Sequence, residues 1–538
     1  MGRSRVLSFI LILVIGLLPF LAAPARAQDG GERPIFRFAG DAGDLQSLDP
    51  HYAVGGLDRP VVDMVFNGLV RYKPGNLAEI EPDLAEAVPA PEIIDGKQTW
   101  TFSLRRGVMC HPSPVTDAYE LTADDVVYSL QKSADADTSG FAADYEGMTV
   151  EKVDDYTVRI TQDPPLSPTL FLPKVANYAG GFIVCSKAVE AMGLDAFRTH
   201  PVGTGPFMFQ SYTPQNSVEL IANDDYFRGA PKLAGVIARY MPDPSTRELG
   251  LQSGELDAAV GLYDEQWVQR INASGDITAD VFGVGEVAFI CLNVTAAPLD
   301  DLNVRQAIAY AISRDEHLAL YGESIAENVY SVVPAQFMPG GLTREEAEAA
   351  QVLFEQDIEK ARQLLAEAGY PDGFEMNLIA SEMETYQGNY EVLQAELAQI
   401  GITINLNVID HATMQSQIRQ DVNPIVVYIA YRPNADAYLT QFFHSDSIVV
   451  TGAKPVSNFS HYDGVDDLIE RARTETDPAA QEELWKQANV QILEDVAVYP
   501  LNDRKFVWAR RNSVDYGHEL VSTAALYPQI TEQTTIAD

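Results

Sequence analysis

Alternation of apolar and polar positions marks short strands along the chain, and residues 217–221 are a clear example. Before them, Gly-Thr-Gly-Pro at residues 203–206 predicts a tight turn, because glycine permits positive φ and proline restricts the next φ. After them, the β-branched residues 235–240 predict a second strand that leads to a helix from Ser245. A turn, two strands and a helix indicate part of an α/β domain.

Strand and helix patterns alternate through the rest of the chain. Residues 374–380 predict a strand, residues 389–401 a helix and residues 402–408 an alternating strand, which together form a β-α-β unit. Residues 424–430 are almost continuously apolar, so this strand is expected in a sheet that is covered on both faces. Residues 496–501 predict a short apolar strand near the C-terminus. The periodicity therefore predicts an α/β fold.

Polar and aromatic side chains gather in loops that follow the predicted strands, at residues 41–46, 381–386 and 428–438. In α/β proteins, ligands bind beyond the carboxyl ends of strands. Loops with aromatic and mixed polar groups are typical of a small-molecule site with apolar walls and a few orienting hydrogen bonds. The candidate ligand-binding residues are Asp44, Gln46, Ser381, Thr385, His411, Tyr428, Tyr431, Arg432, Asn434 and Asp436.

The length of 538 residues exceeds what one hydrophobic core supports, so two or three globular units are expected. Asp and Glu number 77 against 37 Lys and Arg, and this acidic excess argues against nucleic acid or an anionic membrane as a partner. Acidity by itself indicates no function.

The first 27 residues have the pattern of a secretory signal peptide. Arg3 and Arg5 precede an apolar run over residues 6–21, and Ala25-Arg26-Ala27 provides the small residues for cleavage after Ala27. No cysteine stands at the cleavage site, so a lipid anchor is not expected, and no other stretch is apolar enough to span a bilayer. The mature protein is expected in the periplasm.

The chain has three cysteines, Cys110, Cys185 and Cys291. An oxidising compartment permits at most one disulfide among them, and their spacing matches no zinc motif. We expect burial as small hydrophobic residues, and which of them pair stays open.

The sequence contains no constellation that indicates an enzyme. It has no Gly-x-Ser-x-Gly, phosphate loop, His-Glu-x-x-His or Cys-x-x-Cys motif. The eight histidines are scattered, and none lies four residues from another, which excludes a helical metal pair but not ligands assembled from distant loops. We therefore predict a binding protein with no metal and no cofactor.

Three stretches carry a resemblance to a known family. They are the region 201–260, the pair TWTFSLRRGV at residues 99–108 and LTADDVVYSL at residues 121–130, and the strand 289–294 followed by PLDDLNVRQAIAYAISR at residues 298–314. These motifs resemble the peptide/nickel-type (family 5) solute-binding proteins of ABC importers. The resemblance covers essentially all of the mature chain, although the usual His-x-Gly turn of the family is altered after His111.

The resemblance implies a type II periplasmic-binding-protein fold of the larger, three-lobed kind. Lobe I would be discontinuous, with residues 28–70, 205–293 and 496–538. Lobe II would be inserted at residues 71–204, and lobe III would span residues 294–495. A small solute would bind between hinged lobes, and a monomer in its closed, loaded state would meet the transmembrane subunits of an ABC permease.

The loop after the strand 424–430 departs from the pattern of peptide-binding relatives, which carry a Trp and then an Asp that pairs with the α-amino group of the ligand. Here Tyr428 or Ile429 stands at the Trp position, and Tyr431 or Arg432 at the Asp position. Either Asp436 or Asp44 replaces the missing acid, or the ligand has no ammonium group there. Arg432 could instead bind a carboxylate with two hydrogen bonds, and His411 is a further, weaker candidate contact.

The predicted function is capture of a peptide or peptide-like solute for an ABC importer. One alternative keeps the fold and changes the cargo to a metal chelate, an oligosaccharide or an opine-like compound, and the lost Asp favours it. Another alternative is an extracytoplasmic sensor or chaperone subunit that binds a protein.

Overall fold

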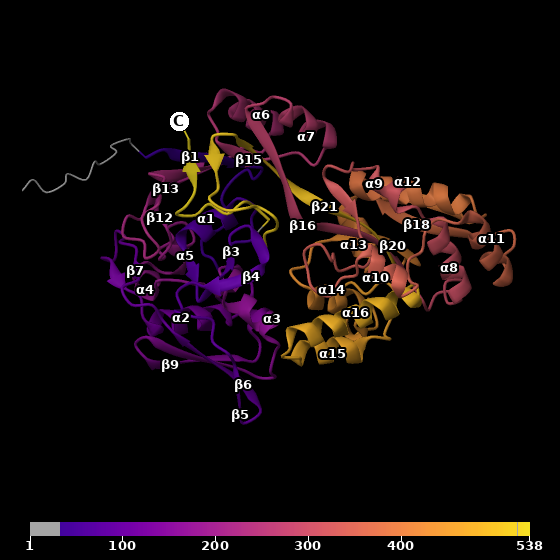
Figure 1. Cartoon of the computed structure of the whole chain (residues 1–538), viewed down its shortest axis with the longest axis horizontal. Helices are drawn as coiled ribbons and strands as arrows, with labels where there is room; N and C mark the ends of the chain where they lie inside the picture. Colours follow the sequence, from indigo (N-terminus) through magenta and orange to yellow (C-terminus); the bar gives the residue numbers. More distant parts are fainter. Residues whose placement is uncertain (1–32, 525, 538) are drawn as a thin grey trace, which may run out of the picture. The chain divides into compact units, whose positions relative to one another are not determined.

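The structure is a computed structural model that describes residues 33–524 and 526–537 (Figure 1). The predicted signal peptide, residues 1–27, lies outside the described residues. Residues 34–538 form one unit by their internal contacts, with helices and strands alternating along the chain as the periodicity predicts. No helix within the described ranges has both the length and the apolar character that crossing a bilayer requires.

A nine-stranded mixed sheet organises the fold. Its order is β12-β13-β14-β1-β15-β21-β16-β20, and β17 pairs with β21 outside this path. β1 lies parallel to β14 and β15, and the remaining pairs are antiparallel. The strands are β1 (Ile35–Gly40), β12 (Phe207–Thr213), β13 (Ser217–Ala222), β14 (Gly235–Tyr240), β15 (Ala258–Val260), β16 (Ile277–Leu292), β17 (Ala326–Asn328), β20 (Ile425–Ala430) and β21 (Val498–Arg511).

The longest strands, β16 and β21, run side by side and exceed their predicted lengths (Figure 1). β16 has 16 residues and β21 has 14. Alternation in β16 breaks at Gly283-Val284-Gly285, and β21 continues beyond its apolar start through Asn502-Asp503-Arg504-Lys505. Both predicted strands, 289–294 and 496–501, were therefore too short, because cross-strand pairing overrides a local loss of apolar pattern.

A four-stranded antiparallel sheet, in the order β5-β6-β10-β9, belongs to the segment 71–204. Its strands are β5 (Glu92–Ile94), β6 (Lys97–Ser103), β9 (Met148–Asp154) and β10 (Thr157–Gln162). Trp100 of β6 stacks on Phe171 with a ring-centroid distance of 4.4 Å, and both side chains are buried. This stacked pair forms part of the core beneath the sheet.

The predicted β-α-β unit is present, with β18 (Glu375–Ser381) parallel to β19 (Thr403–Ile409) and α12 (Glu384–Ala398) between them in sequence. The helix was predicted from residue 389, and it begins five residues earlier. The Ser381 hydroxyl accepts a hydrogen bond from the Met383 N–H at 3.0 Å, which turns the chain into the helix. Thr385 therefore lies in the first turn of α12, where a loop was predicted.

Helices such as α7 and α12 pack on strands, and α14, α15 and α16 lie together (Figure 1). The helices of at least seven residues are α1 (Asp58–Val65), α2 (Ala123–Ser133), α4 (Ser186–Met192), α6 (Pro244–Ser253), α7 (Glu265–Asn272), α8 (Leu302–Ala311), α11 (Ile358–Glu367), α12, α13 (His411–Ile418), α14 (Ala435–Phe443), α15 (Asp466–Thr474) and α16 (Pro478–Glu494).

Two of the three cysteines form a disulfide. Cys110 and Cys185 are joined, with their Cα atoms 5.9 Å apart, and Cys291 is free and buried. All three cysteines are buried, as expected, and the pairing that the sequence left open is Cys110–Cys185. The bond joins the last residue of β7 (Met109–Cys110) to the residue that precedes α4.

Candidate ligand-binding site

A cavity of about 380 Å³ lies between residues of the segment 72–179 and residues of the segment 433–473. This volume falls in the usual range for small-molecule sites. Its walls combine tyrosine rings and aliphatic side chains with two cations and two carboxylates. They are formed by Tyr72, Asp144, Tyr145, Leu166, Leu170, Pro173, Lys174, Tyr178, Ala179, Pro433, Asn434, Asp436, Ala437, Thr440, Gln441 and Arg473.

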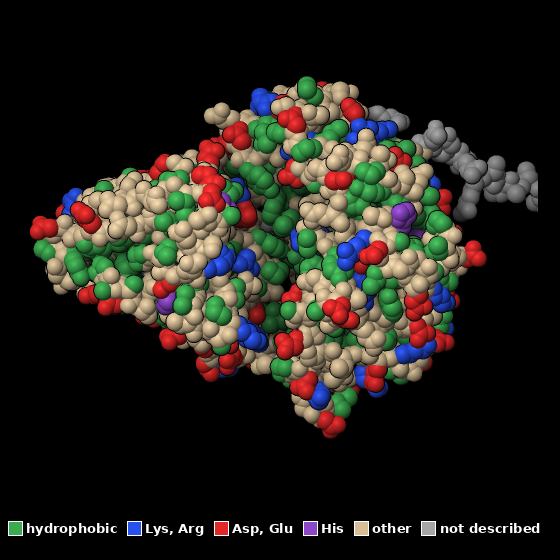
Figure 2. All heavy atoms as spheres, turned by 180° about the vertical axis from the view of Figure 1, so that it is seen from behind, with side chains coloured by type: hydrophobic (Ala, Val, Ile, Leu, Met, Phe, Trp, Pro, Cys, Tyr) green, Lys and Arg blue, Asp and Glu red, His purple; other side chains and the backbone are tan. Residues whose placement is uncertain are grey.

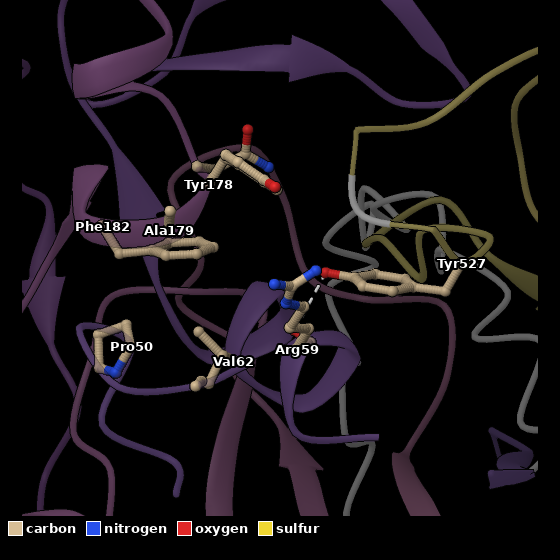
Figure 3. A pocket seen from close by; sticks show the side chains of 9 residues that line it. Pro50, Arg59, Val62, Tyr178, Ala179, Phe182 and Tyr527 are labelled. Carbon is tan, nitrogen blue, oxygen red and sulfur yellow. Dashed lines mark hydrogen bonds between the residues drawn. The ribbon is translucent and has the colours of Figure 1, made fainter. Parts of the chain in front are cut away.

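A second, smaller cavity adjoins the first, because Tyr178 and Ala179 line both (Figure 3). Arg59 of α1 enters it, with its guanidinium carbon 6.0 Å from the centroid of the Tyr178 ring. Tyr527, from the C-terminal segment, donates its hydroxyl to the Arg59 carbonyl at 3.0 Å. Figure 2 shows a face that is hollowed, with apolar side chains in the hollow and Lys and Arg side chains beside it.

Tyr431 and Arg432 follow β20 next to these cavities. Tyr431 donates its hydroxyl to the Ala524 carbonyl at 3.2 Å. Burial raises the pKa of Tyr431 well above its usual value, and the nearby phenol of Tyr178 adds to this rise, whereas Arg59 lowers it. Tyr431 therefore lies within electrostatic reach of both Tyr178 and Arg59.

The Arg432 guanidinium lies 4.9 Å from the centroid of the Phe442 ring. Its Nε donates to Gln441 at 2.5 Å and its Nη1 to the Tyr431 carbonyl at 2.7 Å. Burial lowers the pKa of Arg432. Within the described ranges, no carboxylate lies in salt-bridge distance of Arg432 or of Arg59. Both cations thus lack an anionic partner from the described chain.

Asn434 and Asp436 line the larger cavity, but each already has a partner. Asn434 caps α14, since its side-chain oxygen accepts from the Ala437 N–H at 2.9 Å. Asp436 forms an ion pair with Arg473 at 3.0 Å. Burial raises the pKa of Asp436, and Arg473 opposes that rise.

Asp44 and Gln46 line neither cavity. Asp44 accepts hydrogen bonds from the Tyr212 hydroxyl at 2.7 Å and the Gln215 N–H at 2.8 Å, in the hairpin of β12 and β13. Both hydrogen bonds lower the pKa of Asp44, and the bond from Tyr212 has the larger effect. The Gln46 side chain is exposed. The loop 41–46 therefore contacts the hairpin and stays apart from the two cavities.

Ser381, Thr385, His411 and Tyr428 also lie outside both cavities. The Ser381 hydroxyl and the His411 Nδ1 are 3.0 Å apart, and the His411 ring lies 5.1 Å from that of Tyr386. Tyr428 is only 7% exposed and accepts a hydrogen bond from Arg419. Its ring packs against Phe442 and Phe459. Of the ten candidates, Asn434 and Asp436 line the larger cavity, and Tyr431 and Arg432 directly precede its lining residue Pro433.

Sequence reasoning missed the cavity residues Arg59, Tyr72, Lys174, Tyr178, Arg473 and Tyr527. They come from distant parts of the chain, and none belongs to a motif. Only the fold places them next to residues 431–441.

The nine-stranded sheet with its inserted smaller sheet, and a solute-sized cavity between segments that are far apart in sequence, define a periplasmic-type solute-binding protein. The chain belongs to the family described as "Bacterial extracellular solute-binding proteins, family 5 Middle", whose profile matches residues 79–449. Members of this family are transport binding proteins that act outside the cytoplasm.

Three relatives illustrate the range of the family. The solved structure of MoaA from A. tumefaciens R10, in complex with mannopinic acid, is 38% identical with a TM-score of 0.72, over 94% of this chain and 100% of that chain. The dipeptide-binding protein of Escherichia coli is 29% identical, over 79% of this chain and 81% of its own length. Heme-binding protein A of Haemophilus influenzae is 28% identical, over 79% of both chains.

Proposed function

We propose that this protein is the periplasmic solute-capturing component of an ABC importer and that its cargo is a small organic acid of the opine type. The signal peptide would be cleaved after Ala27, and the mature monomer would deliver its cargo to the permease. The 38% identity to a protein solved with mannopinic acid supports this cargo over the peptides and heme named for relatives of lower identity.

One observation carries the proposal: the guanidinium groups of Arg59 and Arg432, beside Tyr178 and Tyr431, have no carboxylate partner in the described chain. A half-buried cation without an anion is costly, because burial removes its hydration. A carboxylate of the ligand would supply the missing partner, and arginine binds a carboxylate with two parallel hydrogen bonds. Arg432 bonds to Gln441, the Tyr431 carbonyl and Tyr428, which are all neutral groups, so the described residues do not neutralise its positive charge.

The energetics fit a solute-capturing protein. A micromolar dissociation constant corresponds to about −8 kcal/mol. Truncation of one member of a buried charge pair costs about 2–5 kcal/mol, so one arginine–carboxylate pair accounts for much of the affinity. Contacts from both walls of the cavity would favour a closed state, because a ligand shifts a conformational equilibrium only through differential contacts.

Isothermal titration calorimetry with mannopinic acid tests the proposal. The wild type is expected to bind, and Arg432→Ala is expected to weaken binding by at least about thirtyfold. The matched control is Arg362→Ala, which removes an exposed arginine of α11 that donates to the Gln399 carbonyl. Equal affinity of wild type and Arg432→Ala would refute the role of Arg432, and no binding by the wild type would refute this cargo.

A free-amino peptide is the second candidate cargo, since dipeptide-binding proteins are among the relatives. To bind a peptide, Asp436 would have to release Arg473 and pair with the α-amino group of the peptide instead. Titration with the dipeptide Met-Leu decides between the two. Binding of Met-Leu that is lost in Asp436→Ala supports the peptide, and no binding excludes it.

A further inference from the structure

Asp503, in the middle of β21, is a fully buried carboxylate with little hydrogen bonding, since the Gly285 N–H is the one backbone donor near it among the described residues. Its exposed fraction is 0%, and neither carboxylate oxygen accepts a well-formed hydrogen bond from the described residues. Buried polar groups in folded proteins nearly always have a partner, and a buried charge is expensive without one. A cationic partner from outside the described residues would therefore stabilise Asp503 when it is ionised.

The sheet register places Asp503 in line with the loop that carries Arg432. Asp503 pairs with Val287 of β16, and Val287 pairs with Ala430, the last residue of β20. Directly paired residues project on the same face of a sheet, and two strand spacings are roughly 10 Å. Asp503 therefore lies on the face that bears Ala430, two residues before Arg432.

Tyr438 of α14 lies over this face. Burial raises the pKa of the Tyr438 phenol, and the charge of Asp503 is the next largest cause, while Arg432 lowers that pKa. Tyr438 is thus close to both Asp503 and Arg432. It donates its own hydroxyl to the Ala430 carbonyl at 3.3 Å, so it does not satisfy Asp503.

The cations nearest to Asp503 are already engaged. Lys505 pairs with Glu327 of β17 at 3.0 Å, and Arg504 pairs with Glu286 of β16. Glu327 stands directly opposite Asp503 across the strand pair. Burial raises the pKa of Asp503 to about 7, and repulsion by Glu327 adds to the rise, whereas Lys505 and the Gly285 N–H lower it. The surroundings therefore favour an added cation.

We propose that Asp503 binds the ammonium group of the solute whose carboxylate binds Arg432. The ligand class is then a zwitterionic amino-acid conjugate, and Asp503 replaces the acid that the loop after β20 lacks. Asp436 and Asp44 do not take this role, because Arg473 and the Tyr212 hairpin respectively hold their carboxylates. This inference rests on the proposed function and assigns a second charged contact to the same site.

The test compares Asp503→Asn with the wild type by calorimetric titration of mannopinic acid at pH 8. Asp503→Asn is expected to weaken binding by at least about thirtyfold. The control Asp44→Asn makes the same isosteric change at a carboxylate bound by the β12–β13 hairpin, and it is expected to bind like the wild type. Thermal melts without ligand verify that each variant is folded.

The pH dependence gives a readout that a purely structural role would not alter. Between pH 6 and pH 8 the wild-type affinity is expected to rise about tenfold as Asp503 ionises, and Asp503→Asn is expected to show no such rise. The other charged or titratable groups around Asp503 are Glu286, Glu327, Arg432, Tyr438, Arg504 and Lys505, and all are retained in the variant.

The outcomes separate the two proposals. A wild type that binds no mannopinic acid refutes the proposed cargo and, with it, this inference. A wild type that binds while Asp503→Asn binds equally well with the same pH profile refutes the Asp503 contact alone and leaves a buried water as its partner.

Discussion

Asp503→Asn is expected to remove a large pH dependence of stability from the ligand-free protein. The pKa of Asp503 rises from an ordinary value of 3.8 to about 7 in the folded state, because the carboxylate is buried. The folded state then binds a proton that the unfolded state releases between these two pH values. Stability therefore falls as pH rises from 4 to 7, and the loss is complete above the folded pKa.

The magnitude follows from the shift. About three pKa units correspond to about 4 kcal/mol of unfolding free energy between pH 4 and pH 8. For a cooperative unit of this size, 4 kcal/mol shifts Tm by roughly 4 °C. Asparagine has nearly the same shape and carries no charge, so the variant should lack this contribution.

Differential scanning calorimetry of both proteins, from pH 4 to pH 8 and after removal of any bound solute, measures the difference. The Tm of Asp503→Asn minus that of the wild type should increase by several degrees over this range. Other buried carboxyls, such as Asp63 with a pKa raised by burial to about 6, contribute equally to both proteins and cancel. A difference that stays constant with pH would show that Asp503 has a partner in the free protein.

Three further predictions concern the framework. Reduction of the Cys110–Cys185 disulfide, which spans 75 residues of sequence, is expected to lower the free energy of unfolding by up to about 4 kcal/mol, measured by urea denaturation with and without reductant; an unchanged midpoint would contradict this. Lys132→Met leaves the buried Asp49 without its cation at 2.8 Å and is expected to cost about 3–5 kcal/mol, whereas an unaltered urea midpoint would show that the pair is dispensable. Asp44→Asn is expected to reduce stability more at pH 7 than at pH 3, because a lowered pKa contributes stability that declines as pH falls below the unfolded pKa of 3.8; equal destabilisation at both values would refute the assignment.

Local pattern was sufficient to predict the α/β class and the β-α-β unit of β18, α12 and β19. It failed where the local signal and the tertiary pairing disagree. β16 continues through Gly283-Val284-Gly285 because β21 pairs with it on both sides of that break. The local pattern of apolar residues cannot predict a pairing with a distant strand. The Cys110–Cys185 pair likewise depends on how β7 and α4 meet, which spacing alone does not determine.

Only one loop of the candidate site, residues 431–436, could be predicted from the sequence. The strand–loop rule led to residues 431–436, which lie at or beside the cavities. It also selected Asp44, which bonds the distant β12–β13 hairpin, and Ser381, which closes a local turn. Asp and Ser side chains in loops can bond backbone N–H groups as well as ligands, so their residue type does not separate the two roles. Arg59 and Tyr178 carry no signal in the sequence, because their role arises from packing between distant segments.

A crystal structure of the mature protein with mannopinic acid tests the central claim most directly. The account predicts the ligand between residues 59–179 and 431–441, with a carboxylate oxygen within about 3 Å of the Arg432 guanidinium. A ligand that binds elsewhere, or one that lies in the cavity with its carboxylates away from both Arg59 and Arg432, would contradict it.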